Sequence, residues 1–292
     1  MSSPHRAMLG IIGGTGMAEA LGSLGSGEQT RVDTPFGPPS SPIRVVEIGG
    51  APVALLPRHG EGHRLQPSEV PYRANVFALK AVGVTHVLAT AAVGSLREEI
   101  RPGELVVPDQ VIDRTFRRMP TFFDVLAVHV EFAQPFCSAL RKLLLGARAE
   151  ARVHDGGTYV CMEGPQFSTL AESLTYKAQG FSVIGMTNMP EAKLAREAEI
   201  CYASVAMVTD FDCWHPDHDA VTVQDIIRVL NSNAGKAKAL VARLARDFPR
   251  EHEPCPVGSD KALDTALITA PEARDPQLLK KLDVVAGRVL RS

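Results

Sequence analysis

Short apolar runs rich in β-branched residues alternate with stretches of helical periodicity along most of this chain. Runs of this length and composition are typical of buried strands, and the stretches between them are typical of amphipathic helices. Such alternation predicts an α/β domain with a largely parallel or mixed sheet. The expected strands cover residues 8–12, 43–48, 52–56, 86–91, 105–107, 182–186 and 202–208. The clearest expected helices cover residues 72–82, 168–179, 190–198 and 222–247.

The C-terminal part of the 292-residue chain has a different character. Residues 248–260 are rich in proline and polar side chains, and a last amphipathic stretch follows near 276–290. No residue pattern in this part points to chemistry. We therefore expect a catalytic domain over residues 1–247 and a C-terminal appendage over residues 248–292.

Charge and cysteine content argue against several functions. The formal net charge is −2, and no Lys/Arg-rich run offers the stripe that a nucleic acid backbone needs, so we expect no nucleic acid partner. Five cysteines without a C-x-x-C pair fit a reducing compartment. No apolar stretch reaches the roughly 18 residues of a membrane span, and the stretch at 7–12 is too short for a signal-peptide core. We expect a cytoplasmic protein without membrane contact.

A glycine turn, Gly13-Gly14-Thr15-Gly16, follows the first expected strand. Without side chains its backbone N–H groups can close on an anion, and the Thr15 hydroxyl can donate as well. An ordinary tight turn or a dinucleotide loop are the alternatives. The spacing is not G-x-G-x-x-G and no Walker lysine follows, which disfavours the dinucleotide loop.

Two further segments close buried strands with groups that can bind an anion. Arg58-His59-Gly60 follows the apolar run at 54–57, and open α/β sheets bind ligands at such strand ends. Arginine can grip an oxyanion with two hydrogen bonds, although a solvated loop is the commoner explanation of a lone Arg-His pair. The segment 89–95 ends in small residues and Gly94, which allows a ligand to approach closely.

Residues suited to a flat, partly apolar ligand follow later in the chain. Phe167, in the turn that begins at Glu163, can stack on a ring, and Glu163 can bind hydroxyl groups. Met186 and Thr187 close another expected strand just before a proline-started helix. Core packing is the alternative for both Phe167 and Met186.

Two carboxylates, Asp210 and Asp212, stand one residue apart at the mouth of the last expected strand. Strand alternation aims them to the same side. A partly desolvated carboxyl beside another has a raised pKa and suits a general acid. Loop capping is one alternative. A metal site with the Asp/His cluster at 215–219 is another, which we rank low because helical H-E-x-x-H spacing is missing.

Taken together, these motifs resemble the trimeric purine nucleoside phosphorylases over residues 9–245. The similarity is specific because many separate motifs occur in the same order. The segments that carry it are Gly13-Gly14-Thr15-Gly16, Asp33-Thr34-Pro35-Phe36-Gly37, Arg58-His59-Gly60, Gly94-Ser95-Leu96-Arg97, Glu163-Gly164-Pro165-Gln166-Phe167, Met186-Thr187 and Thr209-Asp210-Phe211-Asp212-Cys213-Trp214.

The resemblance implies a single domain whose mixed central β-sheet is flanked by helices, and a homotrimer. Within the family the motifs are most similar to those of the methylthioadenosine-specific branch. That branch converts S-methyl-5'-thioadenosine and inorganic phosphate into adenine and 5-methylthioribose 1-phosphate, in purine and methionine salvage. The expected partners are therefore the nucleoside and phosphate, a co-substrate, with no cofactor and no metal.

Carried onto matching positions, the resemblance also assigns roles to residues of this chain. Phosphate is expected at Thr15, Arg58, His59, the Ala92 backbone and Thr187. The nucleoside is expected at Gly94, with Met186 against the ribose, Phe167 by the base, Asp210 at purine N7 and Asp212 at the 6-amino edge. The methylthio group is expected against His129 of a neighbouring subunit and the apolar face of Val223, Ile226 and Ile227. A thioether favours that dry face by roughly 1–3 kcal/mol, since a 5'-hydroxyl there loses hydrogen bonds.

Two positions depart from the family pattern, and three rival functions stay open. Ala91 replaces a threonine often found near the phosphate, and Gly185 replaces a polar residue before the ribose methionine. A phosphorylase for methylthioinosine or another 6-oxopurine nucleoside is the runner-up, although Asp210 favours the amino base. A non-catalytic nucleoside-binding module does not need Arg58, Thr187 and Asp210 together. A metallohydrolase built on the acidic loop ranks third.

Overall fold

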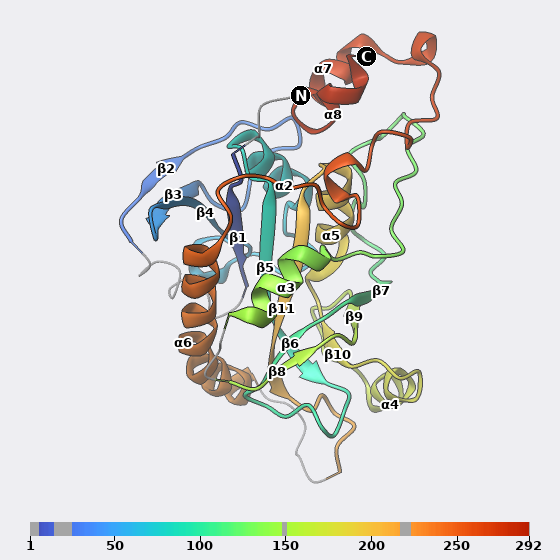
Figure 1. Cartoon of the computed structure of the whole chain (residues 1–292). Coiled ribbons are helices and arrows are strands. Elements are labelled where there is room, and N and C mark those ends of the chain that lie inside the picture. Colours follow the sequence, from blue (N-terminus) through green and yellow to red (C-terminus); the bar gives the residue numbers. More distant parts are fainter. Residues whose placement is uncertain (1–5, 15–24, 148–150, 217–222, 292) are drawn as a thin grey trace.

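The computed structural model describes residues 6–14, 25–147, 151–216 and 223–291, with part of the side chains of residues 223–234 excepted. Within this part of the chain one eleven-stranded mixed sheet runs through the molecule (Figure 1). The strand order is β2-β3-β4-β1-β5-β10-β9-β7, with β11 between β5 and β6 and with β8 beside β6. The strands are β1 (Leu9–Gly13), β2 (Glu28–Thr30), β3 (Ile43–Ile48), β4 (Ala51–Pro57), β5 (His86–Ser95), β6 (Leu105–Val107), β7 (Gln110–Arg114), β8 (Val153–Asp155), β9 (Thr158–Met162), β10 (Val183–Gly185) and β11 (Cys201–Asp210).

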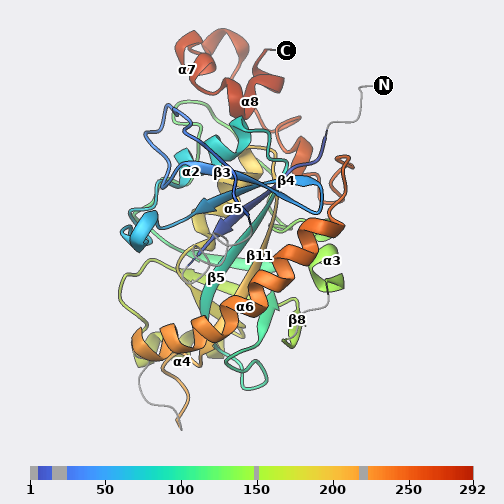
Figure 2. The ribbon, with the colours of Figure 1, turned by 90° about the vertical axis from the view of Figure 1, so that its left-hand side faces the viewer.

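Helices cover both faces of this sheet. α6 (Val223–Asp247) and α3 (Ser138–Gly146) lie on one face, and α6 crosses the strands diagonally in Figure 2. α5 (Asn188–Glu197) and α2 (Tyr72–Ala81) lie on the other face. α4 (Leu170–Ala178) stands at the lower end in Figure 1, and a capping box of Thr169 and Glu172 begins it. The expected α/β fold with a mixed central sheet is confirmed.

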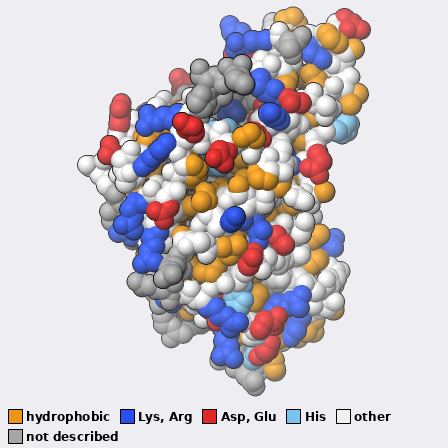
Figure 3. Space-filling view, in the orientation of Figure 1, with side chains coloured by type: hydrophobic (Ala, Val, Ile, Leu, Met, Phe, Trp, Pro, Cys, Tyr) orange, Lys and Arg blue, Asp and Glu red, His pale blue; other side chains and the backbone are white. Residues whose placement is uncertain are grey.

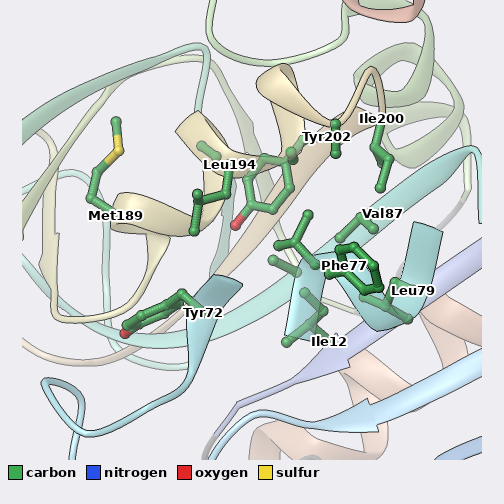
Figure 4. Close-up of a cluster of buried hydrophobic side chains, with 14 of the residues drawn as sticks. Ile12, Tyr72, Phe77, Leu79, Val87, Met189, Leu194, Ile200 and Tyr202 are labelled. Carbon is green, nitrogen blue, oxygen red and sulfur yellow. The ribbon is translucent and has the colours of Figure 1, made fainter. Parts of the chain in front are cut away.

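Strand alternation divides the apolar side chains between the two faces. Ile11 and Leu88 face α3 and α6, whereas Ile12 and Val87, their chain neighbours, face α2 and α5. Figure 4 shows the second cluster, in which Ile12 and Val87 lie beside Phe77. Residues two apart share a face and residues one apart do not, and because both faces are covered, the central strands β1, β5 and β11 are buried along almost their whole length.

The C-terminal residues pack onto this body. α7 (Pro276–Lys281) and α8 (Asp283–Leu290) form the upper end in Figure 1. Leu282 and Val285 join the α2 side of the core, and Cys255 joins the α6 side. The segment at Val128 pairs with Leu267 in an antiparallel bridge. Residues 248–291 therefore contribute to both apolar clusters.

Two central strands are longer than the sequence predicts. β5 continues to Ser95 rather than ending at residue 91, and β11 continues to Asp210 rather than ending at residue 208. The two strands pair in parallel along almost their whole length, which supports small residues such as Gly94 that have little strand propensity of their own. α3, β2, β7 and β8 were not expected, although Leu140, Leu143 and Leu144 of α3 have helical spacing. No helix in the described ranges is long and apolar enough to cross a membrane.

Candidate active site

An opening in the strand pairing lies along one edge of β5. β1 pairs with this edge up to Ala89, and antiparallel β10 pairs with it from Gly94 onward. Among the described residues no strand covers positions 90–93 on this side, while β11 covers the opposite edge. Beyond β10, Gly185 lies beside Val93 of β5. The β5 backbone at positions 90–93 has no strand partner on this side in the described part of the chain, and its Thr90 carbonyl accepts from Arg58.

The glycine turn closes one end of this opening. The Gly14 N–H donates to Thr90 Oγ1 at 3.0 Å. A Cβ atom on Gly14 would stand 2.5 Å from the Thr90 carbonyl oxygen and 2.9 Å from Arg58 Nη1, so only glycine fits. The sequence argument expected the N–H groups of this turn to bind an anion, whereas the Gly14 N–H is used within the protein. Thr15 and Gly16 lie outside the described residues.

Arg58 is completely buried and already has strong partners. Its Nε and Nη2 donate to the two Glu191 carboxylate oxygens at 2.7 and 2.8 Å, and its Nη1 donates to the Thr90 carbonyl at 2.8 Å. Tyr202 donates to the same carboxylate at 2.8 Å. Burial lowers the pKa of Arg58, but the Glu191 carboxylate outweighs this and raises it above its usual value. Arg58 is therefore one partner of an ion pair at the opening. The bonds named above leave one N–H group on Nη1 and one on Nη2.

His59 is buried and neutral. Burial and the neighbouring Arg58 lower its pKa to about 3. Its Nδ1 lies 2.8 Å from the Leu65 carbonyl oxygen, which can only accept, so Nδ1 carries the proton. The ring stacks on His63 at a centroid distance of 4.2 Å. Nε2 is consequently an acceptor, suited to the hydroxyl of a protonated phosphate rather than to a bare oxyanion.

The segment from β10 into α5 forms the second side of the opening. Thr187 is buried at the start of α5. A Cβ atom on Gly185 would overlap the hydroxyl of Tyr159, which reaches across from β9. The Tyr159 hydroxyl is buried, which raises its pKa, and hydrogen bonding to the Thr187 backbone and side chain acts against that rise. The departure at Gly185 thus has a steric reason: the tyrosine occupies the space where another side chain would lie.

Asp210 and Asp212 stand at the end of β11, beside Gly94. A Cβ atom on Gly94 would come within 2.9 Å of Asp210 Oδ1. Burial raises the pKa of Asp210 to about 6, against the hydrogen bonds that it accepts from Thr209 Oγ1 at 2.5 Å and from the Asp212 N–H at 2.7 Å. Burial also raises the pKa of Asp212, whose Oδ2 has no partner among the described residues. One aspartate is thus an acid close to neutral pH, and the other offers a free acceptor.

The two aspartates do not share a side by strand alternation, as the sequence argument assumed. β11 ends at Asp210, and Asp212 has a positive φ of 53°. A turn places the Asp212 N–H on the Asp210 carboxylate. The prediction that the two carboxylates lie close together is correct, but this turn, rather than strand alternation, brings them together.

An arginine that the sequence analysis missed connects the segments that carry Glu163, Met186 and Met189. Arg118 donates to Glu163 Oε1 at 3.0 Å and to the backbone carbonyl oxygens of Glu163, Met186 and Met189. The other Glu163 oxygen accepts the N–H groups of residues 116 and 117. The Glu163 carboxylate is therefore occupied by the protein, contrary to the expectation that it binds ligand hydroxyls. Met186 packs against Gly164, where a Cβ atom would stand 2.6 Å from its sulfur.

The chain that forms this opening, with its buried arginine and with an aspartate of raised pKa, is similar to known proteins. A family model described as the phosphorylase superfamily matches residues 8–246. The chain belongs to this superfamily. It is 66% identical over 290 residues to the S-methyl-5'-thioadenosine phosphorylase of Bradyrhizobium diazoefficiens, covering 98% of this chain and 99% of that protein.

Solved structures of phosphorylases have the same fold. A methylthioadenosine phosphorylase from an Antarctic soil metagenomic library superposes with a TM-score of 0.88 at 44% identity, over 96% of this chain and 99% of that one. The methylthioadenosine phosphorylase of Schistosoma mansoni, solved in complex with adenine, gives a TM-score of 0.83 at 36% identity, over 88% and 97%. The resemblance identified from the motifs is confirmed.

The remaining expected residues of this phosphorylase lie away from the centre of the opening or outside the described part. Phe167 is 44% exposed, which leaves its ring face free for a base or another chain. His129 is exposed on the segment that pairs with residues 266–268, consistent with a role toward a second subunit. The side chains of Val223, Ile226 and Ile227 are outside the described residues. Their proposed roles stay predictions.

Proposed function

We propose that this phosphorylase cleaves S-methyl-5'-thioadenosine with inorganic phosphate, releasing adenine and 5-methylthioribose 1-phosphate. The observation that carries the proposal is Asp210. Its carboxyl group is buried, has a pKa of about 6 and lies against Gly94, on strands that border the opening with Arg58 at its other end. An acid on one side and an anion site on the other are what cleavage of an N-glycosidic bond needs.

The chemistry follows from the charges that develop as that bond breaks. The sugar becomes positive and the purine becomes negative, so groups aimed at these charges stabilise the transition state. Asp210 in its protonated form donates to N7 of the leaving base. Phosphate attacks the anomeric carbon from the opposite side, and its negative charge stabilises the cationic sugar before the new C–O bond forms.

Phosphate is proposed to lie at positions 90–93 of β5. The Ala92 backbone, the Thr187 hydroxyl, Thr15 and the remaining Arg58 N–H groups are its donors. His59 Nε2 accepts the hydroxyl of monohydrogen phosphate, which orients the deprotonated oxygens toward the donors and the sugar. Ala91 provides no hydroxyl to this set.

Asp212 favours a 6-amino purine. Its Oδ2 is buried without a partner, and a ligand N–H would satisfy it. A 6-oxo group would present a second acceptor to that oxygen. Asp212 also has a raised pKa, so its protonated form would serve an oxo base. A phosphorylase for 6-oxopurine nucleosides such as methylthioinosine is therefore the second candidate, favoured at acidic pH.

A homotrimer completes the proposed site. Several large apolar side chains near the purine end are exposed in the single chain, which is typical of a surface covered by another subunit. These residues are Phe116, Met119, Phe167, Leu170 and Leu174. In such an assembly His129 of a neighbouring subunit and the apolar positions Val223, Ile226 and Ile227 enclose the methylthio group.

The assignments of cofactor, partners, location and domain bounds are also part of the proposal. No cofactor or metal is required, because phosphate, Asp210 and the backbone donors account for every step. Acidic and basic side chains are mixed over the face in Figure 3, which supports small-molecule partners rather than nucleic acid. We place the enzyme in the cytoplasm, in purine and methionine salvage, with its catalytic domain in residues 1–247.

The test compares methylthioadenosine, adenosine and methylthioinosine, each with and without phosphate, by release of the free base. Base release from methylthioadenosine that requires phosphate and withstands a metal chelator is the expected result. Equal release of adenine without phosphate would identify a hydrolase instead. Adenosine as the better substrate would contradict the methylthio preference.

A further inference from the structure

Three of the five cysteines meet at the end of the sheet remote from the proposed active site. Cys137, Cys201 and Cys255 are all buried, and their sulfur atoms lie within 4.8 Å of one another. The sulfurs of Cys137 and Cys255 are 3.5 Å apart. Cys201 begins β11 and Asp210 ends it, so about 30 Å of strand separates the cluster from the proposed acid. Phosphorolysis makes no use of these thiols.

A backbone N–H group points at one of the three sulfurs. Cys137 is the N-cap of α3, and its sulfur accepts the Leu140 N–H at 3.5 Å, where the helix dipole also favours a thiolate. Cys255 begins a turn that Gly258 closes through its N–H to the Cys255 carbonyl.

The spacing of the sulfurs fits a metal ion. A metal–sulfur bond of about 2.3 Å places three sulfurs around a three-coordinate ion about 4 Å apart. The Cys137–Cys255 separation of 3.5 Å is about half an ångström shorter, and every separation in the cluster lies within 4.8 Å. No His, Asp or Glu ligand atom of the described residues joins the group within the same 4.8 Å limit. Leu140, Leu144 and Phe248 share the apolar cluster around it. Soft ions that accept low coordination by thiolates, above all Cu(I), suit such a site better than four-coordinate Zn(II).

We propose that Cys137, Cys201 and Cys255 form a binding site for one soft, thiophilic metal ion held by three thiolates. Entry of the ion forms three metal–sulfur bonds, and the protons still on the thiols pass to solvent. Cys255 retains 8% exposure, whereas Cys137 and Cys201 have none, so the ion enters from the side of Cys255. The bound ion ties α3, the start of β11 and the segment after α6 together, which gives residues 248–292 a stabilising role.

The experiment titrates the reduced, metal-free full-length protein anaerobically with Cu(I) against a coloured Cu(I) chelator, and in parallel with Zn(II) against a zinc chelator. We expect one Cu(I) per chain, a higher thermal unfolding temperature and Zn(II) lost to its chelator. Affinity should fall as pH decreases, because protons compete for the thiolates. Activity should remain unchanged, as the ion lies far from Asp210.

Variants of single cysteines test whether these three residues hold the bound ion. Cys255→Ser should weaken Cu(I) binding by more than the roughly 10–100-fold that loss of an outer-shell partner costs. Cys201→Ala provides a second ligand deletion, and Cys213→Ser, outside the cluster, is the matched control that keeps full binding. Circular dichroism verifies that each variant is folded. Absence of bound Cu(I), equal binding by Cys255→Ser, retention of Zn(II) alone, or a disulfide under these reducing conditions would overturn the proposal.

Discussion

Replacing Asp210 by asparagine tests the assignment of the general acid. Asparagine preserves the shape of the side chain but cannot protonate N7. General acids contribute about 10²–10⁴-fold to rate, and this loss is expected where wild-type Asp210 is fully protonated. With a pKa of about 6 in the free enzyme, the acid form falls to about 9% at pH 7 and about 1% at pH 8.

The direction of the pH dependence follows from the raised pKa of Asp210. The active form is present below pH 6 and is lost tenfold per unit above it, so the advantage of wild type over Asp210→Asn shrinks as pH rises. The assay measures kcat/KM for methylthioadenosine at pH 5 to 8, always as the ratio of wild type to variant. Ionisation of phosphate affects both enzymes and cancels in this ratio.

Two controls sharpen the experiment. Asp155→Asn removes an exposed carboxylate that pairs with Arg141, and it should leave kcat/KM at the wild-type level throughout. A 6-oxo substrate should lose less than methylthioadenosine in Asp210→Asn. A wild-type to variant ratio that does not change with pH, or an equal loss on both substrates, would refute the role of Asp210 as the acid.

Three further substitutions address the anion end of the opening. Glu191→Gln leaves Arg58 buried without its counter-charge, so unfolding by denaturant should show a loss of about 3–5 kcal/mol; full stability would contradict the importance of the pair. Gly14→Ala forces a methyl group against the Thr90 carbonyl, and we expect the KM for phosphate to rise at least tenfold with a smaller change in the KM for nucleoside; equal changes would place the turn elsewhere. Tyr159→Phe removes a buried hydroxyl that lies beside Thr187, so the free energy of unfolding should fall by no more than about 1 kcal/mol, and a larger decrease would contradict this.

The fold was predictable because its signals are local. Apolar runs and helical periods revealed β1, β4, α2 and α6, and glycine turns marked where ligands approach. The extension of β5 and β11 was not predictable from period, because pairing between two strands supports residues that prefer no strand. Short edge strands such as β2 and β8 have no apolar period to find.

The places of several candidate site residues in the fold were predictable, but their partners were not. Arg58 and Asp210 follow apolar runs, so their position at strand ends could be inferred. The partner of Arg58 is Glu191, 133 residues away, and nothing in a single sequence pairs them. Arg118 escaped notice for a similar reason, since its partners are mainly backbone carbonyls on distant segments.

The pairing of Arg58 with Glu191 has a consequence for turnover. In each cycle the enzyme exchanges one anion, phosphate, for another, a sugar phosphate that must leave. An isolated buried cation would hold both tightly and make product release slow. An arginine that is already neutralised contributes directed N–H groups with little long-range attraction. The site can then discriminate anions by geometry while it releases them readily, and its affinity should depend only weakly on ionic strength.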